Sequence, residues 1–207
     1  MGPPEAVVAA LQKRLQLDCF VETGTYRGDT AAWAATCFAR VITIELSPAY
    51  HLAAVERFRR QGAVQPLVGD SKAVLAKVLT DRSSPALFWL DAHWSGLDTA
   101  GKGDECPLLE EVRLINGTTV PHVVLVDDAR LFAAPPPRPH CAEQWPDLAA
   151  IIDVLAAQGK RYVVLYEDVL IAVPVAERTF LRTFLQEALT VANESTGVRG
   201  WWKNLWR

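Results

Sequence analysis

The chain has 207 residues, of which 50% are hydrophobic and 22% charged, so it can bury the core of one domain and is not expected to be disordered. Its formal net charge is −3 and no basic stripe stands out, which argues against a nucleic-acid partner. The sequence shows no signal-peptide pattern, no apolar run that could span a bilayer and no CxxC spacing. We therefore expect a cytoplasmic protein with reduced thiols, no stable membrane insertion and a single domain over residues 1–207.

Strand and helix signals alternate along the chain. Val7, Leu11 and Leu15 recur at helical spacing, and Ser47-Pro48 is typical of a helix start, with a capping residue followed by proline. In chain order the patterns predict a helix over 7–15, a strand over 18–22, a helix over 31–38 capped by Asp29 or Thr30, a strand over 41–44, a helix from Pro48 to before Gly62, a weaker strand over 64–68 interrupted by Pro66, a helix over 73–79 capped by Ser71, a strand over 86–90, a helix over 107–115, a strand over 122–126, a helix over 146–158, strands over 161–166 and 169–173, and a helix over 177–192.

Repeated strand–helix units predict a mostly parallel sheet covered by helices on both faces. Only Glu167-Asp168 separates the last two strands, which is too short for a crossover, so these strands should pair antiparallel. The predicted fold class is therefore α/β, a three-layer, doubly wound, seven-stranded sheet with one antiparallel strand. The proline run over 134–139 should form a stiff surface loop.

Ligands of such sheets bind outside the carboxyl ends of the strands. After the first strand, Gly24 would allow a sharp turn and Gly28 a close approach of the backbone to a ligand. The second strand ends in Glu45, whose carboxylate can accept hydrogen bonds from both hydroxyls of a ribose. The third strand ends in Gly69-Asp70-Ser71, where a carboxylate and a backbone amide can recognise an adenine edge.

The stretches ETGTYRG, IELS and GDS resemble the cofactor motifs of class I methyltransferases that depend on S-adenosylmethionine (SAM). The resemblance covers almost the whole chain and implies the Rossmann-like fold of that family, a methyltransferase activity and SAM as cofactor. It implies that Glu22, Gly24 and Gly28 surround the methionine part of SAM. The full set of cofactor-binding residues expected on this basis is Glu22, Thr23, Gly24, Thr25, Gly28, Thr30, Glu45, Leu46, Ser47, Gly69, Asp70, Ser71 and Asp91.

These motifs also allow two interpretations from other functional classes. An NAD-dependent oxidoreductase also needs glycines after the first strand and an acid after the second, but GTYRG lacks the middle glycine of that fingerprint. Glu22 would also place negative charge beside a pyrophosphate, whereas it suits the amino group of SAM. A module that binds SAM without catalysis is the other alternative, and the presence of Glu22, Glu45, Asp70 and His93 argues against it.

Acidic residues follow the fourth and fifth strands, as Asp91 and as Asp127-Asp128. These strands should be neighbours, so the carboxylates would converge, which is costly unless a cation joins them, and oxygen ligands suit Mg²⁺. The pattern resembles metal-dependent O-methyltransferases of the catechol, caffeoyl-coenzyme A and macrocin types. That resemblance implies Asp91, Asp127 and Asp128 as ligands of Mg²⁺ or another divalent cation, and a diol, catechol or sugar-like small molecule as substrate.

His93 follows Asp91 by two residues, so both side chains should face the same side of an extended segment. A histidine there could accept the proton of the substrate hydroxyl, for which its ring must be neutral in the free enzyme. The related families place Asp or Lys near this point. A metal-independent methyltransferase with His93 as its base is thus the alternative to the metal-assisted enzyme.

The motifs ETGTY, DAHWS, CPLLEE and VDDAR together also resemble a loosely defined group of small bacterial methyltransferase-like proteins with no settled substrate. The Gly-rich stretch 95–105 is either a substrate lid or a surface insertion. The aromatic, basic tail 199–207 could close the active site, form a homodimer contact or rest on a membrane, or simply pack on its own domain. A zinc site from His93, Cys106, His140 and Cys141 has spacings that match no usual zinc motif.

Overall fold

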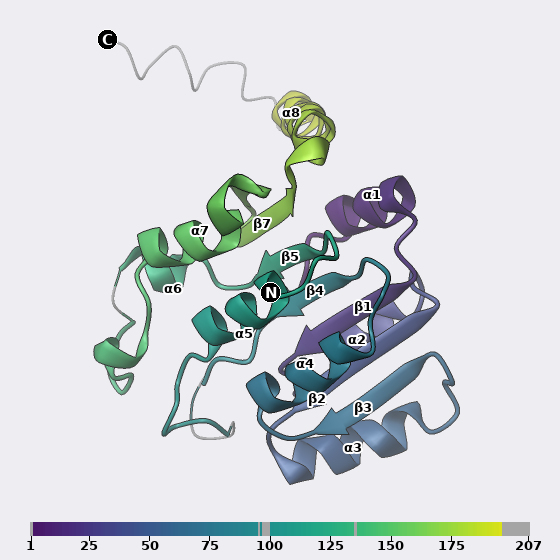
Figure 1. The fold of residues 1–207 in the computed structure, drawn as a ribbon, viewed down its shortest axis with the longest axis vertical. Helices are drawn as coiled ribbons and strands as arrows, with labels where there is room; N and C mark the ends of the chain where they lie inside the picture. The colour runs from purple at the N-terminus through teal and green to yellow at the C-terminus, as the bar shows by residue number, and fades with distance from the viewer. Residues whose placement is uncertain (1, 95, 97–99, 135, 196–207) are drawn as a thin grey trace.

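The computed structural model describes residues 2–94, 96, 100–134 and 136–195 (Figure 1). Its α-helices are α1 (Glu5–Leu15), α2 (Asp29–Ala34), α3 (Pro48–Phe58), α4 (Ser71–Thr80), α5 (Leu108–Asn116), α6 (Arg130–Ala133), α7 (Leu148–Ala156) and α8 (Arg178–Ser195). Its strands are β1 (Cys19–Thr23), β2 (Arg40–Glu45), β3 (Val64–Val68), β4 (Leu87–Leu90), β5 (Val123–Val126), β6 (Arg161–Tyr166) and β7 (Val169–Pro174). The tail 199–207 and residues 95 and 97–99 of the Gly-rich stretch lie outside the described residues.

The strands form one seven-stranded sheet in the order β3-β2-β1-β4-β5-β7-β6. β7 runs antiparallel to both β5 and β6, and the other pairs are parallel. The predicted fold class is confirmed, including the closing antiparallel hairpin. Pro66 is tolerated because β3 is an edge strand, where a missing backbone donor costs no ladder hydrogen bond.

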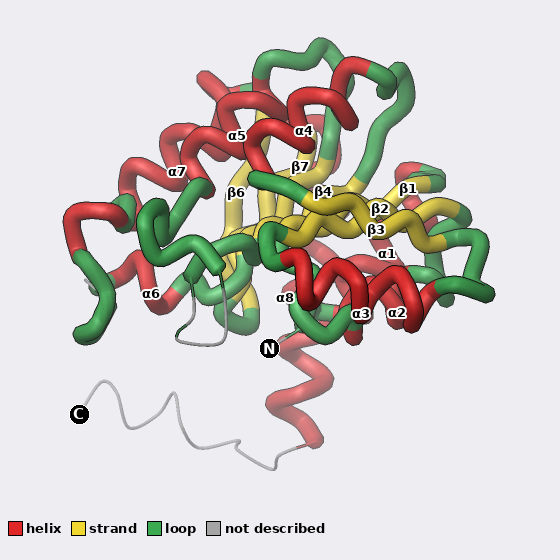
Figure 2. The backbone as a smooth tube through the Cα atoms, turned by 90° about the horizontal axis from the view of Figure 1, so that it is seen from below, coloured by secondary structure: helices red, strands yellow, loops and turns green. Residues whose placement is uncertain are grey.

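Helices cover both faces of the sheet, as Figure 2 shows edge-on. On one face α4, α5 and α7 pack on a buried cluster that includes Ile44 and Phe88. On the other, α1, α2, α3 and α8 pack on a cluster that includes Phe20 and Trp89. β4 and β5 are buried along their whole length because they lie in the middle of these three layers. The acidic residues that follow them are thus presented at the edge of a rigid core.

Several helix starts differ from the prediction. Gly28 precedes α2 in a left-handed conformation, and no side chain caps that helix, so neither Asp29 nor Thr30 has the expected role. Asp70, and not Ser71, caps α4, because its carboxylate accepts hydrogen bonds from the backbone N–H groups of Lys72 and Ala73. The short helix α6 was not predicted, since four residues are too few to show a helical period.

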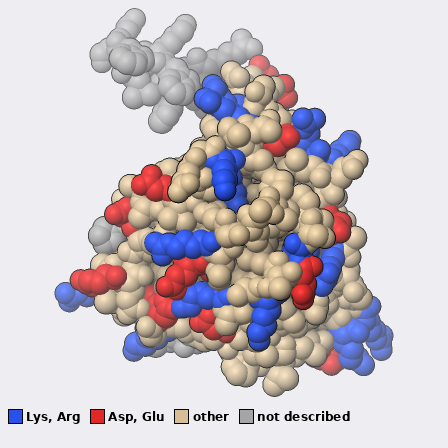
Figure 3. All heavy atoms as spheres, viewed as in Figure 1, with Lys and Arg blue, Asp and Glu red and all other residues tan. Residues whose placement is uncertain are grey.

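No helix among the described residues combines the length and the apolar character needed to cross a membrane. Acidic and basic side chains are intermingled on the face of the molecule shown in Figure 3.

Candidate active site

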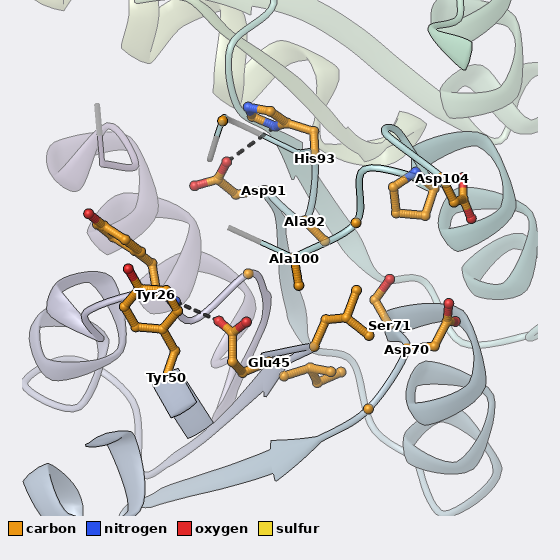
Figure 4. Close-up of a pocket in the computed structure, with 17 residues that line it drawn as sticks. Tyr26, Glu45, Tyr50, Asp70, Ser71, Asp91, Ala92, His93, Ala100 and Asp104 are labelled. Carbon is orange, nitrogen blue, oxygen red and sulfur yellow. Dashed lines mark hydrogen bonds and ion pairs between the residues drawn. The ribbon is translucent and has the colours of Figure 1, made fainter. Parts of the chain in front are cut away.

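A pocket of about 390 Å³ opens where β1, β2, β3 and β4 end (Figure 4). The sheet order reverses between β1 and β4, and ligands of doubly wound sheets bind at such a switch point. Among the residues predicted from the sequence, those that line the pocket are Gly24, Glu45, Leu46, Gly69, Asp70, Ser71, Asp91 and His93. The three motifs that resembled a cofactor site thus meet in one cavity.

Glu45 ends β2 and is held by two backbone donors. Its Oε2 accepts a hydrogen bond from the N–H of Tyr26 and its Oε1 one from the N–H of Ser47, both at 2.8 Å. These bonds fix the carboxylate, and each oxygen keeps a lone pair for a ligand. Figure 4 shows Glu45 at one side of the pocket, beside the rings of Tyr26 and Tyr50, whose centroids are 4.9 Å apart.

Gly24 and Gly28 are required for different reasons. A side-chain carbon on Gly24 would lie 2.3 Å from the carbonyl oxygen of Asp91, so only glycine lets the ends of β1 and β4 approach this closely. A carbon on Gly28 would instead lie 3.0 Å from the ring of Phe58, and Gly28 does not line the pocket. The expected close approach of Gly28 to a ligand is therefore a packing contact with α3 in this structure.

Glu22 lies behind the pocket wall and is almost fully buried, with 1% of its surface exposed. Burial raises the pKa of Glu22 to about 8, against the hydrogen bond that it accepts from the hydroxyl of Thr43. Thr25 extends this hydrogen-bond network, because its hydroxyl oxygen lies 2.6 Å from that of Thr43. The predicted residues that do not line the pocket are the cofactor-binding candidates Glu22, Thr23, Thr25, Gly28, Thr30 and Ser47 and the metal-ligand candidates Asp127 and Asp128.

Asp91 and His93 meet at the end of β4, on the same side as expected. His93 Nδ1 lies 3.4 Å from Asp91 Oδ1, and His93 Nε2 lies 3.2 Å from Asp128 Oδ2. Burial opposes a charge on His93, but the carboxylates of Asp128 and Asp91 outweigh it and raise the pKa of the ring. Since both ring nitrogens face carboxylates, the geometry favours a protonated ring, and not the neutral ring expected from the sequence.

Asp91 is the more accessible member of this pair. Its side chain is 33% exposed against 8% for His93, and burial raises its pKa to about 7. Both residues line the pocket, and Asp91 exposes the larger fraction of its side chain there. The two groups titrate as a coupled pair because they lie in direct contact.

Asp127 and Asp128 follow β5 and have different partners. Burial raises the pKa of Asp127 to about 6, and its Oδ1 accepts a hydrogen bond from the N–H of Asp128. Hydrogen bonding to His93 lowers the pKa of Asp128, whose Oδ1 also lies 2.7 Å from Arg130 Nη1. Arg130 in turn pairs with Asp168 of the β6–β7 turn. Asp168 could not be predicted from the sequence, because its contact with Arg130 exists only once the β6–β7 hairpin is docked.

The three carboxylates predicted to bind a metal converge, but not as a ready ligand set. The ring of His93 lies between Asp91 and Asp128, and the guanidinium of Arg130 neutralises Asp128. Within the part of the chain that the structure describes, no group of three His, Cys, Asp or Glu side chains could hold a metal ion. The arrangement therefore does not fit a preformed divalent-cation site.

Aromatic side chains build a wall next to His93. The ring centroid of Trp145 lies 5.4 Å from that of His93 and 5.8 Å from that of Phe132. Glu105 holds this wall in place, since its Oε2 accepts a hydrogen bond from Trp145 Nε1 at 2.7 Å and its carboxylate also accepts from the N–H of Cys141. Sequence reasoning missed Glu105 and Trp145, which are 40 residues apart and show no shared motif.

The Gly-rich stretch contributes to the pocket. Gly96, Ala100, Gly101 and Asp104 line it, and Figure 4 shows Ala100 and Asp104 there. Lys72 of α4 pairs with Asp104. The described part of the stretch therefore borders the pocket, and its interpretation as a substrate lid stays a prediction.

No protein-family model and no curated protein matches the sequence. Solved structures do match its fold. A Staphylococcus aureus protein provisionally named a caffeoyl-CoA O-methyltransferase has a TM-score of 0.60 at 13% identity, over 84% of this chain and 85% of that one. A Streptococcus mutans protein provisionally named a methyltransferase, in complex with S-adenosylhomocysteine (SAH), has a TM-score of 0.57 at 11% identity, over 84% and 99%. An SAH-bound methyltransferase from Podospora anserina has a TM-score of 0.53 at 17% identity, over 82% and 76%.

This chain has the methyltransferase fold. The sequence resemblance predicted that fold, and these comparisons confirm it. The pocket described above lies where ligands of a doubly wound sheet are expected.

Proposed function

We propose that the chain is a SAM-dependent O-methyltransferase that acts on a hydroxyl group of a small molecule. The observation that carries the proposal is the position of Glu45. Its carboxylate is fixed by two backbone donors in the same pocket that ends at Asp91 and His93. A ribose held by Glu45 would direct the rest of the cofactor along the pocket towards these acid–base residues.

The charge of the pocket supports SAM over NAD. The described residues that line it include four carboxyl groups, those of Glu45, Asp70, Asp91 and Asp104, against one cationic side chain, that of His93. SAM carries a positive sulfonium and a positive amino group, which such a lining favours, whereas a pyrophosphate would be repelled. Asp70 and Ser71 are placed on the far side from Tyr26, where an adenine would lie (Figure 4).

The acid–base role falls on the Asp91–His93 pair. When bound, SAM supplies the methyl group for an in-line displacement. Asp91 lines the pocket and accepts the proton of the substrate hydroxyl, while the protonated ring of His93, held by Asp128, pairs with the Asp91 carboxylate and orients it. Trp145 and Phe132 support this pair from the core, since both are buried beside His93 and neither lines the pocket.

Metal assistance stays a prediction of the sequence resemblance. The contacts of His93 and Arg130 with the predicted ligands favour the metal-independent alternative. The expectation of a vicinal diol depended on chelation by that metal, so it is weaker than the expectation of a single hydroxyl.

Calorimetric titration tests the proposal. We expect SAM and SAH to bind with a stoichiometry of about one and NAD not to bind under the same conditions. Binding of NAD without SAM would overturn the methyltransferase in favour of the oxidoreductase. Binding of SAM without transfer to any phenol, catechol or sugar would support the non-catalytic module instead.

A further inference from the structure

Glu111 is a buried carboxylate that the proposed chemistry does not use. It belongs to the CPLLEE motif and lies on α5, with 1% of its surface exposed. Its Oε1 is buried without a hydrogen-bond partner among the described residues. A buried carboxyl oxygen without a partner is costly, so its persistence requires an explanation.

The other oxygen of Glu111 reaches the ends of the strands that form the site. Thr23 Oγ1 donates to Glu111 Oε2 at 3.5 Å, and the N–H of Asp91 donates to the same Thr23 oxygen at 3.4 Å. Glu111 also accepts a hydrogen bond from the hydroxyl of Ser71, which lines the cofactor pocket. One carboxyl group therefore connects β1, the start of α4 and the backbone of Asp91.

Glu111 also borders a small cavity next to the acid–base residues. His93 and Asp127 line the same cavity, in which the centre of a water molecule has about 10 Å³ of space. That volume is roughly what one water molecule requires, and a buried water needs polar partners such as these. A single water here would supply the partner that Glu111 Oε1 lacks.

We propose that Glu111 is a positioning residue of the site, which fixes Asp91 and Ser71 through hydrogen bonds and joins the cluster of His93 and Asp127 through one buried water. The inference rests on the proposed function only for the identity of the ligand in the pocket. Burial raises the pKa of Glu111 to about 7, against the hydrogen bonds from Ser71 and Thr23. Near neutral pH the group therefore exists partly as a carboxylic acid, whose O–H can donate to that water.

The experiment compares wild type with Glu111→Gln and Glu111→Leu, and uses Glu187→Gln, an exposed glutamate of α8, as the control. SAH affinity is measured by calorimetry and folding by thermal melting. We expect Glu111→Gln and the control to bind SAH as wild type does, because an amide can still accept from Thr23 and donate to the water. We expect Glu111→Leu to bind SAH at least tenfold more weakly, about 1.4 kcal/mol. A purely structural residue would instead lower the melting temperature and leave the affinity of the folded protein unchanged.

A crystal structure of the wild type should show one water within hydrogen-bonding distance of Glu111 Oε1. Absence of that water, or equal SAH affinity of a folded Glu111→Leu variant, overturns the inference. If Glu111→Leu does not fold, Thr23→Val tests the same connection, since it removes the hydroxyl between Glu111 and Asp91. Unchanged SAH affinity of Thr23→Val overturns the inference. If wild type binds no SAH, the proposed function fails, and the presence or absence of the water still decides the position of Glu111.

Discussion

Replacing Glu45 by alanine removes the carboxylate that we propose binds the ribose of SAM. Both of its oxygens are held by backbone N–H groups at 2.8 Å, so the carboxylate is already oriented before a ligand arrives. Each hydrogen bond between a ribose hydroxyl and a charged group contributes about 1.5 to 3 kcal/mol. Loss of one such bond predicts roughly tenfold weaker SAH binding, and loss of both predicts more than about a hundredfold.

The assay is calorimetric titration of SAH into each variant at one pH and salt concentration. Glu56→Ala is the matched control, because Glu56 is an exposed glutamate of α3 that pairs only with Arg59 among the contacts that the structure describes. Glu45→Gln separates charge from contact, since its amide oxygen can still accept from one of the two backbone donors. Unaltered affinity of Glu45→Ala, with the fold intact by circular dichroism, would remove Glu45 from the ribose and take away the main support for SAM.

Three further predictions follow from the geometry of the site. With a catechol as acceptor, kcat should rise with pH through the raised pKa of Asp91, and His93→Asn should move that rise to higher pH, because the charge of His93 lowers the pKa of Asp91. The same variant should lower kcat with little effect on SAH affinity; an unchanged pH profile and kcat would return His93 to a structural role. Transfer should persist in EDTA, because two of the three predicted metal ligands already have cationic partners, His93 for Asp91 and Asp128 and Arg130 for Asp128, whereas loss of activity that Mg²⁺ restores would establish metal assistance. Because the pKa of Glu22 is about 8 in the folded protein and 4.5 when unfolded, its protonated form stabilises the fold fully below pH 4.5, and this stabilisation is lost as the pH rises through about 8. In urea titrations the unfolding free energy of wild type should therefore fall, relative to that of Glu22→Gln, by on the order of 4 kcal/mol between pH 5 and pH 9; parallel curves would contradict the raised pKa.

The sequence by itself determined the fold and the end of the sheet where the pocket lies. Buried strands such as HVVLV are apolar on both faces and alternate with helices, which restricts the chain to a covered parallel sheet. The two-residue connection before Val169 required an antiparallel hairpin. Glu45, Asp70 and Asp91 were predictable because strand ends of a parallel sheet converge whatever their separation in the sequence.

Only the tertiary structure decided which of the predicted side chains face the pocket and which lie behind it. Glu22 lies within β1 and Thr25 follows it, yet both contact Thr43 inside the protein, because β1 and β2 pair with Glu22 opposite Thr43. The partners of His93 could not be predicted from the sequence either, because Asp128 and Trp145 are 35 and 52 residues away from it along the chain. A pattern of acidic residues in the sequence does not distinguish metal ligands from the partners of a protonated histidine, because both roles need a negative charge. The roles differ only in whether the fold places a metal ion or an imidazolium ring between the carboxylate oxygens.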